Sequence, residues 1–297
     1  MPPIPSQHFS VSAPPSSPQI DAHHHLWSYD PGEFAWITDE MAPLQRDFLL
    51  PDLCMALRSS RLDAGVAVQA RQSLMETEWL LASARANTAI AGVVGWVPIE
   101  ADDLTTTLDR FAGDGKLVGF REIVQSEPDG FLDRPDFNRG IGTLSDRGFV
   151  YDLLIREHQL PEATRFVDRH PNQRFVLDHA AKPRIAMGEL HPWAERLRNL
   201  ARRANVVCKI SGLATEADWS SWSDVSLRPF LDVCVDAFGP DRLLAGSDWP
   251  VCLLASSYSR WWDMLRAYFS VFTQHEQHQI FGKNAVATYH LRLEPTL

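Results

Sequence analysis

The chain has 297 residues, of which 45% are hydrophobic and 22% charged, and its formal net charge at pH 7 is −10. A negative balance without any cluster of Lys or Arg argues against nucleic acid or an anionic membrane surface as a partner. No stretch approaches the roughly 20 apolar residues of a membrane span, so we expect a globular protein with a large core.

Residues 1–18 are rich in Pro and Ser and have neither a basic region nor an apolar run. We expect them to form a flexible lead-in rather than a secretory signal, and residues 19–297 to form one domain. The four cysteines lie in apolar surroundings without Cys-x-x-Cys spacing, which is typical of buried free thiols in a reducing compartment. The sequence therefore predicts a cytoplasmic protein, as a monomer or a homo-oligomer.

From residue 20 onward, short β-rich runs alternate with segments of helical periodicity. The predicted strands are residues 20–25, 65–70, 91–97, 118–124, 149–155, 174–179, 205–211 and 242–247. The predicted helices are residues 51–62, 74–86, 101–111, 136–147, 161–170, 189–203, 227–238, 258–272 and 276–289.

This alternation predicts a parallel β-sheet with both faces buried. Eight strand–helix repeats favour closure into an α/β (β/α)8 TIM barrel over an open sheet, and about 250 residues is the usual length of such a barrel. No G-x-G-x-x-G or G-x-x-x-x-G-K-[ST] motif follows the first strand, so the dinucleotide-binding and P-loop interpretations lose their main support.

The first predicted strand ends in Asp21-Ala22-His23-His24-His25. Side chains alternate along a strand, so we expect His23 and His25 to share one face with Asp21, and His24 to face away in a structural role. Two imidazoles on one face can hold a metal ion or polarise a carbonyl oxygen.

Other polar residues stand at the ends of the remaining predicted strands, where the active sites of TIM barrels lie. Ionisable groups in such apolar runs are costly unless they are paired or used. The candidates are Arg71, Arg121, Glu122, His179, Lys182 and Asp248, together with Asp152, Asp178 and Lys209 within the strands and Trp36 near the first motif.

In this set the chain resembles the amidohydrolase superfamily, whose first strand carries Asp-x-His-x-His, whose sixth strand carries a His and whose eighth carries an Asp. These positions read Asp21, His23, His25, His179 and Asp248 here. The resemblance narrows to the sugar-lactonase branch of the amidohydrolase-2 group, which includes L-fuconolactonase, and extends over residues 19–291.

The resemblance implies hydrolysis of a small-molecule sugar lactone, an aldono-1,4- or 1,5-lactone. Asp248 is expected to activate water, while His23, His25 and His179 polarise the carbonyl directly or through one divalent ion. Substrate binding is expected of Trp36, Arg71, Arg121, Glu122 and Lys182.

Two departures from the superfamily pattern bear on the metal. The lysine of strand four and the metal-binding histidine of strand five are missing, and Asp152 lies on strand five instead. We therefore expect at most one ion, zinc or manganese, held by His23, His25, Glu122, His179 and Asp248. Catalysis with the ion and catalysis by the histidines alone both stay open.

Glu122 stands where similar lactonases tend to carry His. This leaves a non-sugar lactone open as the substrate. A metal-dependent decarboxylase of the same superfamily is the other alternative, but the residues just past His-x-His include no acid.

Overall fold

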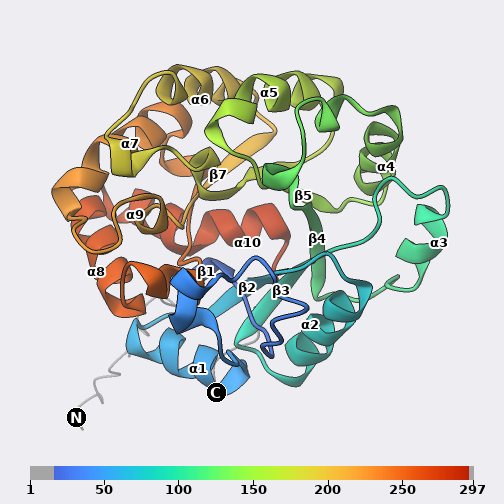
Figure 1. Cartoon of the computed structure of the whole chain (residues 1–297), viewed down its shortest axis with the longest axis horizontal. Coiled ribbons are helices and arrows are strands. Elements are labelled where there is room, and N and C mark those ends of the chain that lie inside the picture. Colours follow the sequence, from blue (N-terminus) through green and yellow to red (C-terminus); the bar gives the residue numbers. More distant parts are fainter. Residues whose placement is uncertain (1–16, 294–297) are drawn as a thin grey trace, which may run out of the picture.

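The structure is a computed structural model in which residues 17–293 are described, so most of the predicted lead-in lies outside the described residues. Eight parallel strands follow one another around a barrel in the order of the sequence, and helices surround them (Figure 1). The strands are β1 (Ile20–His24), β2 (Ala64–Val68), β3 (Ile90–Gly95), β4 (Leu117–Glu122), β5 (Val150–Leu153), β6 (Phe175–Leu177), β7 (Val206–Ile210) and β8 (Leu243–Ala245). The predicted (β/α)8 TIM barrel is confirmed.

The helices lie outside the strands in the described part of the chain. They are α1 (Leu50–Ser59), α2 (Leu74–Ala86), α3 (Leu104–Asp109), α4 (Pro135–Asp146), α5 (Leu160–Arg169), α6 (Trp193–Ala201), α7 (Asp224–Phe238), α8 (Tyr258–Phe269), α9 (Gln274–His278) and α10 (Asn284–Tyr289). None of these described helices combines the length and the apolar character needed to cross a membrane.

Local chemistry explains where two of the predicted helices were placed wrongly. Helix α7 starts three residues before the predicted residue 227, because the Ser223 hydroxyl accepts a hydrogen bond from the Ser226 amide and caps the helix. The predicted helix 276–289 is interrupted by a π-helical turn at Gln279–Lys283. Gly282 in this turn lies against the chain entering β1, since a Cβ atom there would stand 1.8 Å from the carbonyl oxygen of Pro18.

The barrel closes where β8 meets β1, directly at the predicted motifs. The Asp248 amide donates to the His23 carbonyl at 2.8 Å, and the His25 amide donates to the Trp249 carbonyl at 2.6 Å. Two segments more than 200 residues apart in sequence are thereby joined, and the residues expected to act together become neighbours.

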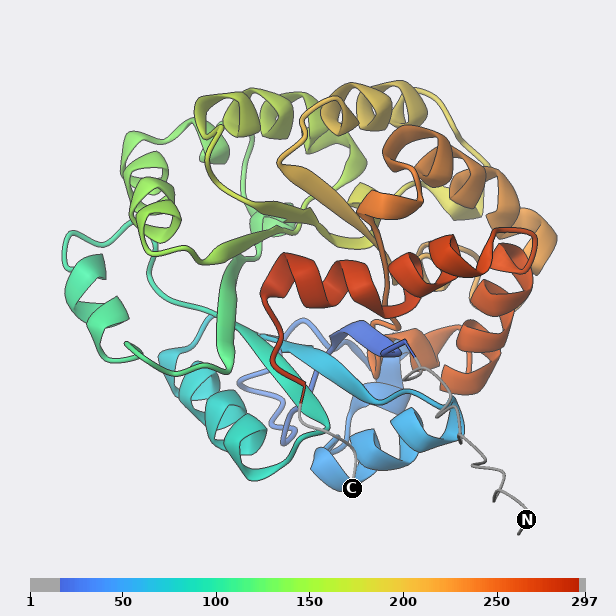
Figure 2. The same cartoon turned by 180° about the vertical axis from the view of Figure 1, so that it is seen from behind.

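The opposite end of the barrel is closed by α10, which Figure 2 shows lying across it. Ala285 and Tyr289 of α10 belong to an apolar cluster with residues of the strands, among them Ile20, Ala22 and Val150. The amino-terminal end is therefore a packed floor, and access to the interior is from the carboxyl ends of the strands.

Strand β1 carries one extra residue, and this corrects an expectation from the sequence. Asp21 pairs with Gly65 of β2, and His24 pairs with Ala67. The step from one pair to the next is therefore three residues in β1 but only two in β2. Such a bulge reverses the alternation of side chains. Asp21 consequently does not share a face with His23 and His25, and it accepts hydrogen bonds from Ser247 and from Tyr258 of α8 instead.

Candidate active site

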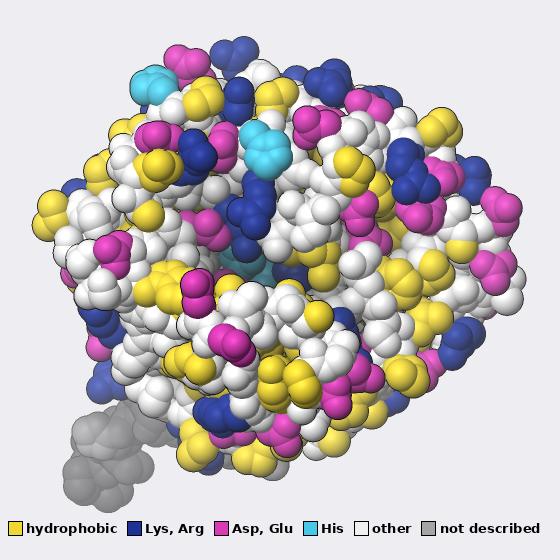
Figure 3. All heavy atoms as spheres, viewed as in Figure 1, with side chains coloured by type: hydrophobic (Ala, Val, Ile, Leu, Met, Phe, Trp, Pro, Cys, Tyr) yellow, Lys and Arg dark blue, Asp and Glu magenta, His cyan; other side chains and the backbone are white. Residues whose placement is uncertain are grey.

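Four of the predicted residues meet at the carboxyl ends of β1, β6 and β8. His23, His179 and Asp248 each offer a ligand atom within 4.8 Å of the others. His25 joins them, because its Nε2 lies 3.2 Å from His23 Nε2 and 3.3 Å from Asp248 Oδ1. All four side chains are buried, and Figure 3 shows this face hollowed near its centre, with histidine atoms at the floor.

The backbone around the site adopts conformations that L-residues rarely take. The four consecutive residues 179–182 have φ between 49° and 60°, and Asp248 has φ of 61°. Each non-glycine residue in this region costs about 1–2 kcal/mol. The surrounding fold holds these residues against that cost, and the left-handed turn aims His179 toward Asp248.

Gly212 leaves the space that Asp248 and His179 occupy. A Cβ atom at this position would lie 2.8 Å from Asp248 Oδ2 and 2.8 Å from His179 Nδ1. The φ of Gly212 is +63°, which also favours glycine. The close approach of base and imidazole therefore depends on the missing side chain.

Hydrogen bonds fix the orientation of the imidazole rings. His179 Nδ1 lies 2.9 Å from the Ser211 hydroxyl, and His25 Nδ1 lies 2.7 Å from the Val68 carbonyl oxygen. Each ring is thereby held at one nitrogen and presents the other toward Asp248.

Burial shifts the pKa values of the site, so that His23 and His179 are neutral near pH 7 while Asp248 is ionised. Burial lowers the pKa of His179 to about 4 and that of His23 well below its ordinary value. Burial by itself raises the pKa of Asp248, but His179 and His25 outweigh it, so the pKa of Asp248 lies below its ordinary value. Near pH 7, Asp248 is ionised and can accept a proton.

Arg121 lies on the wall of the site, held by hydrogen bonds to a buried carboxylate and to the backbone. Its Nη1 donates to Asp178 Oδ2 at 2.9 Å and also lies 3.4 Å from His23 Nε2. Its Nη2 donates to the carbonyl oxygen of Gln69. The structure thus brings Arg121 next to the histidines, chiefly as the partner of a buried carboxylate.

The three other basic or aromatic candidates lie at the rim. Arg71 forms an ion pair with Glu33, and Lys182 Nζ lies 3.6 Å from Glu216 Oε1. Trp36 is 37% exposed. The sequence did not predict Glu33 or Glu216 as partners, because ion pairs between loops leave no periodic pattern in the sequence.

Glu122 does not join the histidine group. Its Oε2 accepts a hydrogen bond from Trp96 Nε1 at 2.9 Å, and its Oε1 accepts one from Gln72. Burial raises the pKa of Glu122 to about 7. The structure therefore places this carboxyl beside Trp96 and Gln72 rather than with the predicted ligands.

Beneath His23 lies a set of buried charges that the sequence indicated only in part. Lys209 Nζ lies 2.5 Å from Asp152 Oδ2 and 3.1 Å from Asp178 Oδ1. Tyr289 of α10 donates its hydroxyl to Asp152 at 2.8 Å. Sequence reasoning missed Tyr289, because no local pattern links a C-terminal helix to the fifth strand.

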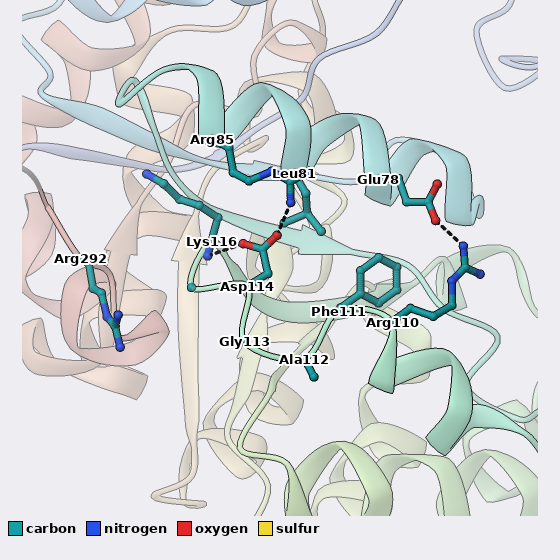
Figure 4. Close-up of a pocket in the computed structure, with 11 residues that line it drawn as sticks. Glu78, Leu81, Arg85, Arg110, Phe111, Ala112, Gly113, Asp114, Lys116 and Arg292 are labelled. Atoms are coloured by element: carbon teal, nitrogen blue, oxygen red, sulfur yellow. Dashed lines mark hydrogen bonds and ion pairs between the residues drawn. The ribbon is translucent and has the colours of Figure 1, made fainter.

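The groove in Figure 4, about 710 Å³ in volume, lies apart from this site. It is bounded by the segment that leads into β4, at the amino-terminal end of the barrel. Arg85 lies 2.6 Å from Asp114, and Arg110 pairs with Glu78. The two acidic side chains of its lining are thus already paired with arginines, and we assign the groove no chemistry.

His23, His179 and Asp248 fit a single divalent ion. Two imidazole nitrogens and a carboxylate oxygen are a donor set that suits zinc, and three protein ligands leave a position for water. Among residues 17–293 no second group of this kind is found.

Comparison with known proteins identifies the relatives of the chain. The family described as amidohydrolase matches residues 20–291. The L-fucono-1,5-lactonase of Burkholderia multivorans (strain ATCC 17616 / 249) is 40% identical over 285 residues, which are 92% of this chain and 96% of that protein. The L-fucono-1,5-lactonase of Burkholderia ambifaria (strain ATCC BAA-244 / DSM 16087 / CCUG 44356 / LMG 19182 / AMMD) is 33% identical over 279 residues, 92% of this chain and 96% of its own.

A solved structure agrees with these matches. The crystal structure of an amidohydrolase from Burkholderia multivorans with bound zinc is similar to this chain with a TM-score of 0.89 and 41% sequence identity. The similarity covers 93% of this chain and all of that one.

Proposed function

Because the chain belongs to the amidohydrolase family, we propose that it is a lactonase that opens a sugar lactone of the L-fucono-1,5-lactone type. The names of the relatives at 40% and 33% identity support this activity. The observation that carries the proposal is the geometry of Asp248, an ionised carboxylate that faces the imidazoles of His25 and His179 at the mouth of the barrel.

In the proposed reaction, Asp248 takes a proton from water as the water oxygen adds to the lactone carbonyl carbon. General base catalysis of this kind contributes about 10²–10⁴-fold. The C–O bond of the ring then breaks, and the ring oxygen leaves with the proton that Asp248 holds. The product is an aldonic acid, whose ionisation releases one proton to solvent.

Negative charge develops on the carbonyl oxygen when water adds. N–H groups of His23 or His179 stabilise it in a water-poor pocket, where such donors are most effective, while His25 donates its Nδ1 hydrogen to the Val68 carbonyl. When one divalent ion is bound, zinc or manganese, His23, His179 and Asp248 would hold it, and it would supply Lewis acidity toward that oxygen.

The rim residues are proposed to hold the rest of the substrate. Lys182 and Arg71 present donors to sugar hydroxyls, and the exposed edge of Trp36 offers an apolar wall. Arg121 supports the pocket from below, through Asp178.

The described cysteines, Cys54, Cys208, Cys234 and Cys252, are all free. We propose a place for this reaction in carbohydrate catabolism in the cytoplasm, since free buried thiols suit a reducing compartment.

A screen of aldono-1,4- and 1,5-lactones with a pH indicator, with and without chelator, tests substrate and metal together. Proton release at rates far above spontaneous hydrolysis is expected for at least one sugar lactone. Non-sugar lactones belong in the same screen as the first alternative. The proposal fails if no lactone is hydrolysed and carbon dioxide is instead released from a carboxylic acid in the presence of zinc.

A further inference from the structure

The buried ammonium of Lys209 has three atoms that can accept a hydrogen bond within 3.1 Å. An ammonium group carries three N–H donors and no acceptor. Lys209 Nζ lies 2.5 Å from Asp152 Oδ2, 3.1 Å from Asp178 Oδ1 and 3.1 Å from His23 Nδ1. The side chain has no solvent exposure, so no water substitutes for these partners. An ammonium can only donate, so in its hydrogen bond with Lys209 the His23 Nδ1 must accept.

An independent hydrogen bond sets the other side of the histidine pair. The Val68 carbonyl oxygen can only accept, so His25 Nδ1, 2.7 Å away, must donate to it. The His25 tautomer that carries its proton on Nδ1 has a lone pair on Nε2. That nitrogen lies 3.2 Å from His23 Nε2, and the contact is a hydrogen bond only when His23 Nε2 carries the proton.

Two longer contacts would favour the opposite arrangement. Asp178 Oδ1 lies 3.3 Å from His23 Nδ1, and Arg121 Nη1 lies 3.4 Å from His23 Nε2. Both groups have a shorter contact elsewhere, because Arg121 Nη1 donates to Asp178 Oδ2 at 2.9 Å and Asp178 Oδ1 lies 3.1 Å from Lys209. In the arrangement set by the shortest contacts, the Lys209 ammonium, His25 Nδ1 and His23 Nε2 each have an acceptor atom within 3.2 Å.

We propose that Lys209 is a positioning residue that holds His23 as the Nε2–H tautomer, so that an N–H donor and not a lone pair faces the pocket. This role deepens the proposed lactone hydrolysis and rests on it. As the lactone opens, His23 turns this N–H from His25 Nε2 to the oxyanion. A metal ion could bind His23 Nε2 only after the proton moves to Nδ1, and this ring would then no longer accept from Lys209.

Lys209 and a metal ion therefore compete for His23, and Lys209→Met should change two properties in opposite directions. Without the ammonium, His23 Nδ1 is free to donate to Asp178, and Nε2 presents its lone pair. We expect kcat to fall about 10²-fold with KM little changed, as for loss of one oxyanion donor. We expect zinc to bind about tenfold more tightly in a chelator competition.

Nitrogen-15 NMR of histidine-labelled protein reads the tautomer directly, with His23→Gln identifying the His23 signals. The wild type should show His23 protonated at Nε2, and Lys209→Met should show it protonated at Nδ1. Lys116, just before β4, donates its ammonium hydrogen to the Ile90 carbonyl at the start of β3. Lys116→Met is the matched control and should change neither the tautomer nor zinc affinity.

Lys209→Met leaves two buried carboxyls with one fewer partner and can fail to fold. The double variant Lys209→Met/Asp152→Asn removes both charges of the Lys209–Asp152 ion pair, and Asp178 keeps Arg121 as its partner. It should give the same NMR and zinc results. A wild-type His23 protonated at Nδ1 overturns the proposal, as does a variant in which kcat and zinc affinity fall together. If the wild type hydrolyses no lactone, the proposed function fails while the NMR and zinc measurements still decide the role of Lys209.

Discussion

Asp248 differs from the other buried acids of the barrel in what surrounds it. Asp152 and Asp178 lie within 3.1 Å of the Lys209 ammonium, so their charges are committed to an ion pair. The neighbours of Asp248 Oδ1 within 3.8 Å are the nitrogens of His23, His25 and His179. A carboxylate that is not held in an ion pair with Lys or Arg keeps its capacity to accept a proton, which a base requires.

Asp248→Asn should lower kcat at least about 10³-fold, because the amide keeps the shape of the side chain but cannot accept the proton of water. Lactone hydrolysis assays together with thermal melts make the measurement. Asp241→Asn, the same substitution at an exposed position in the turn before β8, should leave both unchanged. A kcat within tenfold of wild type would remove Asp248 from the mechanism.

Glu122 should influence stability through its protonation rather than through a metal. Burial raises its pKa from 4.5 to about 7, so the folded protein holds this proton more tightly than the unfolded chain does. That stabilisation is complete below about pH 4.5 and is lost as the pH rises through about 7.

Glu122→Gln should therefore be more stable relative to wild type at pH 8 than at pH 4.5, as measured by urea denaturation at both values. Metal content should not change, because both carboxyl oxygens are bound by Trp96 and Gln72. Glu40→Gln, an exposed counterpart, serves as the control. A parallel loss of metal and activity, restored in part by added ion, would instead make Glu122 a ligand.

At the scale of elements, the site is made by irregularities of the strands and not by their regular parts. The extra residue in β1 turns His23 toward the interior, and the left-handed turn after β6 brings in His179. A regular strand would keep Asp21 and His23 on one face. Both irregularities lie at the carboxyl ends, where deviations leave the packing of the barrel floor intact.

Helix α10 reaches the buried charges of the barrel through the hydroxyl of Tyr289, which donates to Asp152. Tyr289→Phe should lower the free energy of unfolding by about 1–3 kcal/mol, because Asp152 loses a donor in a fully buried environment. Urea denaturation measures this change. Tyr268→Phe removes a hydroxyl that bonds Asp232 near the surface and should cost less than about 1 kcal/mol. Equal losses in the two variants would contradict a special role for the α10 hydroxyl.

At the scale of the whole molecule, folding and site formation are one event, since the last strand must pair with the first before His23 and Asp248 meet. Within the described residues, contacts with the barrel are made from just before β1. The Gln19 amide donates to Asp63 at 2.8 Å, and Pro18 packs against Gly282.

Deletion of residues 1–16 should leave the melting temperature within about 1 °C of wild type and kcat/KM unchanged, because a Pro- and Ser-rich segment has few apolar side chains to bury. Thermal melts and lactone kinetics on the full and shortened chains test this. Deletion through residue 19, which removes the contacts of Pro18 and Gln19, provides the comparison and should be less stable. A fall of more than a few degrees in the first variant would contradict the expectation.

The sequence by itself determined the eightfold alternation of strands and helices, and with it the barrel. It also placed His23, His25, His179 and Asp248 at strand ends, where a barrel must bring them together. These features are local, since the period of apolar residues and the type of residue that ends each run are properties of short segments.

Only the tertiary structure decided which face each of these side chains takes and which partner it has. The bulge that separates Asp21 from His23 depends on the pairing of β1 with β2. Likewise, Glu122 lies with Trp96 and Gln72, and Lys209 bonds His23 across 186 residues of sequence. Such contacts join residues far apart in the chain, and a change of one residue in register reverses a side chain, so no local pattern can specify them.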